Sequence, residues 1–389
     1  MAAPGRWEDA LAGLGMRAAL AQAPGQLADL GGVRQVVLAL SDQARPGLTP
    51  TRRSAVGRRF LVNVTPTIYP DEIAELRRHN VSDLPEGEGV KTFGALEAQS
   101  NGIQRLGVLR MDVDNLGRLF ASGLGKQATL SRVAALSFAV SLYFEGWVEH
   151  LAHERNRTDA QGERLYSIYS GGDDLFFVGA WDAVVELARD LRVDLSRFAA
   201  GHPDVHACAG IALVGGKYPL YQAAQDAQRA EQQAKSLTWW TGDRTATKDA
   251  ISFLGQALTW RQFGLEPCAL KGTDSAHALM HLLTGMTTGQ GDTGRSAPQA
   301  LVRRLIGLYE QYEEAGQRRR ERGDDRNRDG QPQVLWGQWM WLAEYHLGRM
   351  AKQTGNPEVG RLRDRLRADQ FRSMEWIGLA ARWAELLTR

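Results

Sequence analysis

Cysteine is scarce in this sequence, and long apolar runs are missing from it. Cys208 and Cys268 are the two cysteines among 389 residues, which excludes a disulfide framework and a cysteine-rich zinc site. No apolar run approaches the ~20 residues of a membrane-spanning helix. Charged residues interrupt the alanine-rich stretch 1–32, so it lacks the apolar core of a signal peptide. We therefore expect a cytoplasmic protein without a membrane segment.

An excess of charge of either sign is also lacking. The 47 lysine and arginine residues nearly balance the 45 aspartate and glutamate residues, and the formal net charge is +2. Strong nucleic-acid binders usually show a larger basic excess or a basic patch. The composition, 43% hydrophobic and 24% charged, is that of an ordinary globular protein, and the length predicts two domains with a partial third.

Three regions of the sequence differ in their patterns. Residues 1–100 contain few periodic segments and one short strand-like run at 60–64, and we interpret this region as linker-like or partial. Residues 257–389 show no convincing strand and are predicted to form a helical bundle. Its helices are expected near 275–287, 297–316, 333–352, 358–370 and 373–388, with a solvated polar loop at 318–328.

The middle region, residues 101–256, alternates strands and helices in the order βαββαβ plus a strand, which is the ferredoxin-like arrangement. Alanines at 223, 227, 230 and 234 predict a thin apolar stripe that packs closely on a sheet, and Asp182 is a plausible N-cap of the preceding helix. The fold class is therefore α+β, with a ferredoxin-like domain followed by an all-α helical bundle. The predicted strands are 105–112, 165–169, 175–179, 206–214 and 251–254, and the predicted helices are 131–153, 182–198 and the segment from Pro219.

Two acidic clusters stand at the ends of apolar strands. The first strand ends in residues 112–114, Asp-Val-Asp, and a Gly-Gly-Asp-Asp turn at 171–174 joins the two hairpin strands. Because the first strand and the hairpin are neighbours in a βαββαβ sheet, we expect Asp112 to lie beside this turn. Mg²⁺ and Mn²⁺ prefer oxygen ligands, and two such ions can activate a hydroxyl and steady a leaving pyrophosphate. The pattern therefore predicts a metal site that faces a nucleoside triphosphate.

Glycines in the turn permit positive φ and let a phosphate approach the backbone closely. Backbone N–H groups after Asp114 could cradle phosphates where a helical turn begins, and two lysines are candidate phosphate cations. The candidate catalytic residues are Asp112, Asp173 and Asp174, and the candidate metal ligands are Asp112, Val113, Asp173 and Asp174. The candidate nucleotide-binding residues are Val113, Asn115, Leu116, Ser170, Gly171, Gly172, Lys235 and Lys248.

Each element has a simpler interpretation when it stands alone. Gly-Gly-Asp-Asp is a good hairpin turn, Asp-x-Asp is common in loops and caps, and a lysine in the last turn of a helix is favourable anyway. Co-occurrence of the two clusters at strand ends favours a metal site. We interpret the tryptophans of the last region as bundle core rather than base-stacking platforms, namely Trp336, Trp339, Trp341, Trp376 and Trp383.

Together, residues 109–120 and 168–176 strongly resemble the large subunit of type III CRISPR effector complexes, the Palm-domain cyclic oligoadenylate synthetase. The similarity extends through Tyr218-Pro219, Ala234-Lys235, Lys248 and residues 251–255, and it covers about residues 90–389. The resemblance implies a second Palm domain of the nucleotidyl cyclase and polymerase type. It also implies ATP bound with Mg²⁺ or Mn²⁺ between two Palm domains, and 3′–5′ linkage of AMP units into cyclic oligoadenylate when guide RNA captures target RNA.

The resemblance also implies partners. These are ATP, other type III effector subunits, guide and target RNA through the complex, and a chain that supplies the first Palm and nuclease half, or a second copy of this chain. The sequence has no His-Asp dipeptide, so we expect that nuclease domain, and with it the first Palm, to be absent. The chain is then a natural half of a split subunit, a truncated relative or a fragment.

Other functions remain open. One is a scaffold subunit whose Palm no longer catalyses. Another is a diguanylate-type cyclase, although Phe120 stands where that family has a guanine-reading Asn, and Asp174-Leu175 stands where it has Glu-Phe. A viral-type RNA polymerase is more remote, because it would need fingers and thumb domains larger than this chain supplies.

Overall fold

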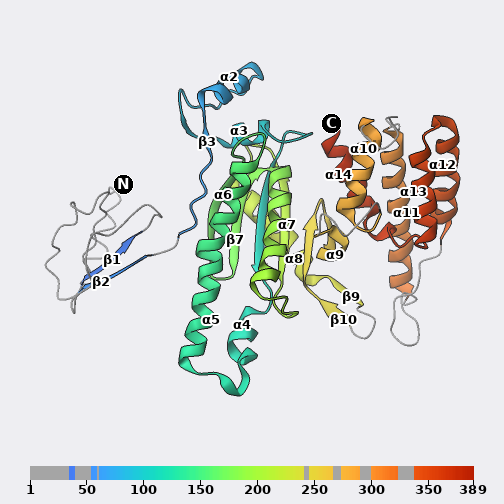
Figure 1. Cartoon of the computed structure of the whole chain (residues 1–389). Coiled ribbons are helices and arrows are strands. Elements are labelled where there is room, and N and C mark those ends of the chain that lie inside the picture. Colours follow the sequence, from blue (N-terminus) through green and yellow to red (C-terminus); the bar gives the residue numbers. More distant parts are fainter. Residues whose placement is uncertain are drawn as a thin grey trace. The chain divides into compact units, whose positions relative to one another are not determined.

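The computed structural model describes residues 35–39, 54–58, 61–240, 245–265, 273–289, 299–322 and 337–389 (Figure 1). The chain forms two compact units, Met1–Val62 and Asn63–Arg389. In the described part of the first unit, β1 (Gln35–Ala39) and β2 (Ser54–Arg58) form a parallel pair. The predicted division at residues 100 and 256 stays a prediction.

A six-stranded sheet forms the centre of the second unit, in the order β12-β11-β8-β5-β7-β6. In this sheet β5 runs antiparallel to both β7 and β8, and the hairpin partner β6 lies at the edge. This is the predicted ferredoxin-like order, which is confirmed. A final hairpin adds β12, which the sequence did not predict, antiparallel to β11. The strands are β5 (Leu106–Val113), β6 (Leu165–Gly171), β7 (Asp174–Ala180), β8 (Ala207–Val214), β11 (Ala250–Phe253) and β12 (Gln256–Thr259).

Two helices, α7 (Trp181–Phe198) and α8 (Leu220–Ser236), approach the sheet very closely through glycines. A Cβ at Gly210 of β8 would lie 2.1 Å from the Glu231 backbone nitrogen in α8, and one at Gly107 of β5 would lie 2.8 Å from the Trp181 Cα. The predicted alanine stripe of α8 is confirmed at 223, 227 and 234, which are fully buried. Glu231, rather than Ala230, takes the remaining buried position. The helix therefore carries a carboxylate toward the sheet.

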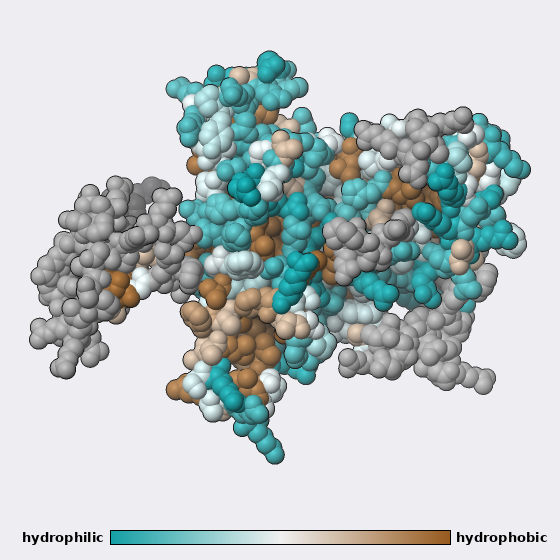
Figure 2. Space-filling model, viewed as in Figure 1, coloured by the Kyte–Doolittle hydropathy of each residue, from teal (hydrophilic) through white to brown (hydrophobic). Residues whose placement is uncertain are grey.

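The predicted helix 131–153 is interrupted. It consists of α5 (Leu130–Leu142), a π-helical turn η4 (Tyr143–Trp147) and α6 (Val148–Thr158). No residue of α5 is buried, and Leu130 and Phe138 are 88% and 63% exposed. Figure 2 shows hydrophobic surface gathered over this part of the molecule. Within α5 the apolar periodicity thus does not mark a buried face, whereas Phe144 in η4 is buried.

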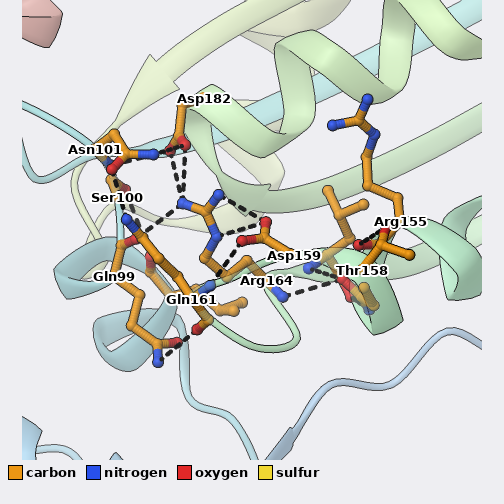
Figure 3. A network of polar contacts seen from close by, with 12 residues as sticks. Gln99, Ser100, Asn101, Arg155, Thr158, Asp159, Gln161, Arg164 and Asp182 are labelled. Carbon is orange, nitrogen blue, oxygen red and sulfur yellow. Dashed lines mark hydrogen bonds and ion pairs between the residues drawn. The ribbon is translucent and has the colours of Figure 1, made fainter.

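Asp182 does not cap α7, because the N-cap position is Ala180. Its carboxylate instead accepts hydrogen bonds from Asn101 Nδ2 at 2.6 Å and from Arg164 Nη1 at 2.8 Å (Figure 3). Arg164 also pairs with Asp159 at 2.7 Å. These residues stand where β5 and β6 begin and β7 ends, so the network ties together the end of the sheet opposite the Gly-Gly-Asp-Asp turn.

The segment of the second unit that precedes β5 packs on the sheet through its helix α3. It contains β3 (Thr67–Ile68), α2 (Pro70–Arg78), β4 (Gly89–Val90) and α3 (Phe93–Ala98), with a small core around Ile68 and Ala95. The predicted strand at 60–64 is wrong for residues 61–64, and Phe60 lies outside the described residues. Val64 contacts the β6 bulge, where its N–H donates to Ser167 Oγ at 2.8 Å. The Val64 carbonyl also accepts from the Ser167 N–H at 2.8 Å, but contacts at a single residue do not extend into a ladder.

The region after the sheet is helical, as predicted. Phe253 of β11 meets Trp383 with ring centroids 5.5 Å apart, and Gln256 Nε2 of β12 donates to the Glu375 carbonyl at 2.6 Å, so the added hairpin joins the sheet to the bundle. The short strands β9 (Thr238–Trp240) and β10 (Thr245–Thr247) precede this hairpin. The helices are α9 (Trp260–Phe263), α10 (Ala276–Thr288), α11 (Ala300–Arg322), α12 (Gln338–Thr354), α13 (Pro357–Ala368) and α14 (Met374–Leu387).

Two predictions for this bundle need correction. α11 continues to Arg322, so residues 318–322 are helical and not loop, while 323–328 lie outside the described residues. Trp339, Trp376 and Trp383 are buried as predicted, but Trp341 is 78% exposed. Trp336 lies outside the described residues. Within the part of the chain that the structure describes, none of the helices has the length and apolar character to cross a membrane.

Gly378→Ala should destabilise the bundle, because its Cβ would lie 2.3 Å from the Tyr309 ring of α11. We expect a loss of about 1–3 kcal/mol in the free energy of unfolding. Gly307→Ala, in α11, is the matched control, since its Cβ meets nothing within 4 Å. That change should stabilise by about 0.5–1 kcal/mol through helix propensity. Chemical denaturation measures both, and equal effects of the two substitutions would contradict the packing described.

Candidate functional site

The β5–β7 ladder brings the two acidic clusters together. Asp112 pairs directly with Asp174, and the Val113 N–H donates to the Asp173 carbonyl at 2.9 Å. Directly opposed residues of antiparallel strands have side chains on the same face of the sheet. The predicted position of Asp112 beside the Gly-Gly-Asp-Asp turn is therefore confirmed, while the chemical roles of these residues stay predictions.

Asp112 lies in a compact group of charges supplied by α8. Lys235 Nζ is 2.6 Å from Asp112 Oδ2 and 2.6 Å from Glu231 Oε1. Burial raises the pKa of Asp112, the ion pair with Lys235 opposes this shift, and the neighbouring Asp173 carboxylate reinforces it. Burial lowers the pKa of Lys235, but its bonds to Asp112 and Glu231 outweigh burial and raise that pKa overall. Lys235 thus remains a cation at neutral pH.

The two turn carboxylates have different surroundings. Asp174 Oδ2 accepts from Arg110 Nη2 at 2.7 Å and from the Tyr169 hydroxyl. For the Asp173 carboxylate, the described residues supply neither a hydrogen bond nor an ion pair. Asp174 is therefore already held within the protein, and Asp173 is the better placed of the two to accept a metal ion.

Asp114 connects the segments next to the acidic cluster, a role that the sequence did not indicate. It is only 2% exposed, and its Oδ2 lies 2.6 Å from His206 Nδ1 and 3.3 Å from Cys208 Sγ. The same oxygen accepts from the Asp249 N–H at 3.1 Å. These contacts fix the neighbouring Lys248, whose Nζ donates to Asn115 Oδ1 at 2.9 Å. Asp114 thereby joins β5, β8 and the segment that carries Lys248.

The backbone around the site has left-handed conformations at predicted residues. Asn115 has φ 61° and precedes the short helix α4 (Leu116–Arg118), and Gly172 has φ 68° with open space around it. The Ser170 hydroxyl donates to the Phe144 carbonyl at 2.6 Å, so here it ties the hairpin to η4. A Cβ at Gly171 would come no closer than 3.8 Å to Glu145 Cγ. The protein alone therefore does not require glycine at 171, and the role of this residue toward a nucleotide stays a prediction.

No group of three or more His, Cys, Asp or Glu side chains in the described ranges is arranged to hold a metal. Mg²⁺, however, is commonly held by one or two carboxylates, with substrate phosphates and water completing the shell. Asp112 and Asp173 meet that smaller requirement. The residues present thus fit a divalent ion that enters together with a nucleotide.

Sequence reasoning brought together most of these residues and missed others. Asp112, Val113, Asn115, Asp173, Lys235 and Lys248 converge as expected at one end of the sheet. Arg110 and Glu231, which connect Asp174 to the Lys235 group, were missed. Arg110 follows the two-residue alternation of β5 from Asp112, and this was the available signal.

Comparison with known proteins identifies the region that holds this site. Residues 105–245 match the sequence model of the Cas10/Cmr2 second palm domain. A protein of Methanocaldococcus jannaschii named CRISPR system single-strand-specific deoxyribonuclease Cas10/Csm1 (subtype III-A) is 34% identical over 171 residues, which are 42% of this chain and 21% of that protein. The protein of the same name in Mycobacterium tuberculosis is 42% identical over 156 residues, 37% of this chain and 19% of that protein. The matched part spans about a fifth of these relatives.

Solved structures extend the likeness of fold over more of the chain. A Csm1–Csm4 cassette in complex with cA4 superposes with a TM-score of 0.56 at 18% identity and covers 92% of this chain and 45% of that chain. The same cassette in complex with AMPPNP gives a TM-score of 0.54 at 18% identity, with 92% and 44% covered. At this level of identity the superpositions show a shared fold.

Lys235→Gln should strengthen binding of a metal ion in the absence of nucleotide. The substitution removes the ammonium group that lies 2.6 Å from Asp112 Oδ2 and competes with a cation there. We expect Mn²⁺ to bind about three- to tenfold more tightly, measured from the electron paramagnetic resonance signal of free Mn²⁺. Lys217→Gln, at an exposed lysine before α8, is the control and should change nothing. Weaker Mn²⁺ binding by Lys235→Gln would show that the ion does not bind at Asp112.

Proposed function

Residues 105–245 are a second palm domain of the Cas10/Cmr2 family, and from this premise we propose that the chain converts ATP to cyclic oligoadenylate when its complex binds target RNA. The resemblance to the large subunit of type III CRISPR effector complexes, drawn above from two motifs, is confirmed for this region. The synthetase activity is our proposal for this chain. The part of the chain that matches the curated relatives corresponds to about a fifth of their length.

One observation carries the proposal: the β5–β7 register brings Asp112 to the end of the sheet where the Gly-Gly-Asp-Asp turn lies, and the Asp173 carboxylate is near enough to raise the pKa of Asp112. A divalent ion held there would supply charge neutralisation and activation of an attacking 3′-hydroxyl. Asp112 and Asp173 would provide the oxygen ligands. Lys248, held by Asn115, adds a cation close to the backbone N–H groups of α4, where a triphosphate would find positive charge.

The solved relatives support ATP as the substrate. Csm1–Csm4 cassettes of the same fold were solved with one ATP, with pppApA, with pppApApA and with cA4. These molecules form a series from the nucleotide through linear oligomers to a cyclic product. We propose the same series of ligands for this chain. The name of the curated relatives includes deoxyribonuclease activity, which we do not propose here because the sequence lacks a His-Asp dipeptide.

We also propose protein partners. The apolar surface of α5, with Leu130 at 88%, Phe138 at 63% and Leu142 at 37% exposure, is unusual for a helix that faces water. The relatives are solved as complexes with Csm4, which supports a subunit of that kind as one partner. A second Palm, from another chain or from a second copy of this one, would complete the ATP site. Guide and target RNA would act through the assembled complex.

A catalytically silent scaffold is the second candidate. In its favour, Asp112 is neutralised by Lys235, and Asp174 is held by Arg110 and Tyr169. A scaffold would keep these pairs as internal ties and would bind no nucleotide between them. The two functions therefore differ in what the carboxylates contribute, and substitution of the carboxylates separates them.

Asp112→Asn and Asp173→Asn should each lower oligoadenylate synthesis by about 100-fold or more, since each removes a charged metal ligand. The reconstituted complex is supplied with target RNA, ATP and Mg²⁺ or Mn²⁺, and products are resolved by chromatography and mass spectrometry. Asp226→Asn, on α8 and paired with Arg229, is the matched control and should retain full activity.

Assembly and target-RNA binding should remain intact in both variants, which is the check that the complexes are folded. If the Asp112→Asn and Asp173→Asn complexes made as much oligoadenylate as the unchanged complex, the assigned roles would be overturned. Absence of any product from the unchanged complex would favour the scaffold. A preference for GTP over ATP would favour a diguanylate-type cyclase.

A further inference from the structure

A groove of about 460 Å³ lies between α11 and α12 in the helical region, far along the chain from the palm motifs. Arg303, Arg304 and Gln311 of α11 form one wall, and Leu342 and His346 of α12 form the other. We call this feature the α11–α12 groove. Its volume is within the range of sites that bind small ligands or single nucleotides.

The α11–α12 groove is positively charged. Arg303 and Arg304 are exposed, and neither forms an ion pair with an acidic side chain of the described residues. Arg349, one turn beyond His346 on α12, donates to the Tyr345 hydroxyl at 3.4 Å and has no ion-pair partner in the part of the chain that the structure describes. Desolvation, together with the positive charges of Arg304 and Arg349, lowers the pKa of His346, as expected of a cationic site.

Among the described residues, no acidic side chain of α11 or α12 forms an ion pair with Arg303 or Arg304. Glu344 is the one carboxylate within α12, and it contacts Arg363 Nε of α13 at 3.6 Å. α11 carries Glu310, Glu313, Glu314 and Glu321, of which Glu314 pairs with Arg318 at 3.1 Å. Arg303 and Arg304 therefore lack an ion-pair partner within the described residues, and an anionic partner is the expected occupant.

Two exposed aromatic residues of α12 are next in sequence to the residues that line the groove. Trp341 is 78% and Tyr345 58% exposed, and with Arg349 they repeat every four residues. Residues four apart are neighbours on one face of a helix, about 6 Å apart along its axis. We call Trp341, Tyr345 and Arg349 the α12 ladder. It displays two flat rings, followed by a guanidinium group, beside the cationic groove.

We propose that the α11–α12 groove and the α12 ladder form a binding site for single-stranded nucleic acid. Arg303, Arg304 and Arg349 contact phosphates, while unstacked bases lie on Trp341 and Tyr345. A cationic groove combined with aromatic platforms is the usual design for binding single strands, because every base offers a flat face. An acidic peptide would use the arginines but would leave the two rings without a function. The proposal is independent of nucleotide chemistry in the palm.

The test uses the full chain and a fluorescein-labelled oligouridylate of about 12 nucleotides, followed by fluorescence anisotropy over a range of NaCl concentrations. Arg303→Ala combined with Arg304→Ala should weaken binding about tenfold or more. It should also make the slope of log K against log [NaCl] shallower by about 1.4, because each of the two lost phosphate contacts contributes about 0.7. Trp341→Ala combined with Tyr345→Ala should weaken binding about fivefold or more and leave the salt dependence unchanged.

Matched controls are available on the same molecule. Arg318→Ala removes a charge from α11 outside the groove, and Tyr221→Ala removes a tyrosine of α8 that is 65% exposed. Both should bind like the unchanged chain, and thermal unfolding followed by circular dichroism checks that every variant is folded. Equal losses from the controls, duplex RNA that binds as tightly as the single strand, or no binding by the unchanged chain would each overturn the proposal.

Discussion

The register between β5 and β7 is the constraint on which the candidate site depends. It places Asp112 opposite Asp174 and the Val113 N–H against the Asp173 carbonyl. Side chains alternate along a strand, so a slip of one residue would turn Asp112 to the other face of the sheet. Gly107, in the same strand, lets α7 pack closely on the sheet, because a Cβ there would lie 2.8 Å from the Trp181 Cα.

Charge compensation is the second requirement. A partly buried carboxylate is costly unless it is paired, and Lys235 provides the pairing for Asp112 and Glu231 together. Glu231 reaches this position because α8 lies almost in contact with Gly210 of β8. In the free protein Lys235 acts as the internal counterion that a bound metal would replace. The charges of Asp112, Glu231 and Lys235 therefore balance one another within the protein itself.

Much of this arrangement could be predicted from the sequence, because strand alternation, the turn residues and the alanine stripe are local signals. The ferredoxin-like order and the proximity of Asp112 to the turn follow from them. The π-helical turn η4, the pairing of β12 and the role of Asp114 depend on contacts between distant segments, and local patterns carry little information about these. For Trp341 the sequence-based prediction was wrong. The residue was interpreted as bundle core together with the other tryptophans of this region, but the bundle buries another face of α12.

The most direct measurement is a crystal structure of the chain with Mn²⁺ and a non-hydrolysable ATP analogue, with an anomalous difference map recorded at the manganese edge. The account predicts a manganese peak about 2.1 Å from a carboxylate oxygen of Asp112 and from one of Asp173, with the triphosphate on the same ion. A peak bonded to phosphates alone, or to neither carboxylate, would contradict it.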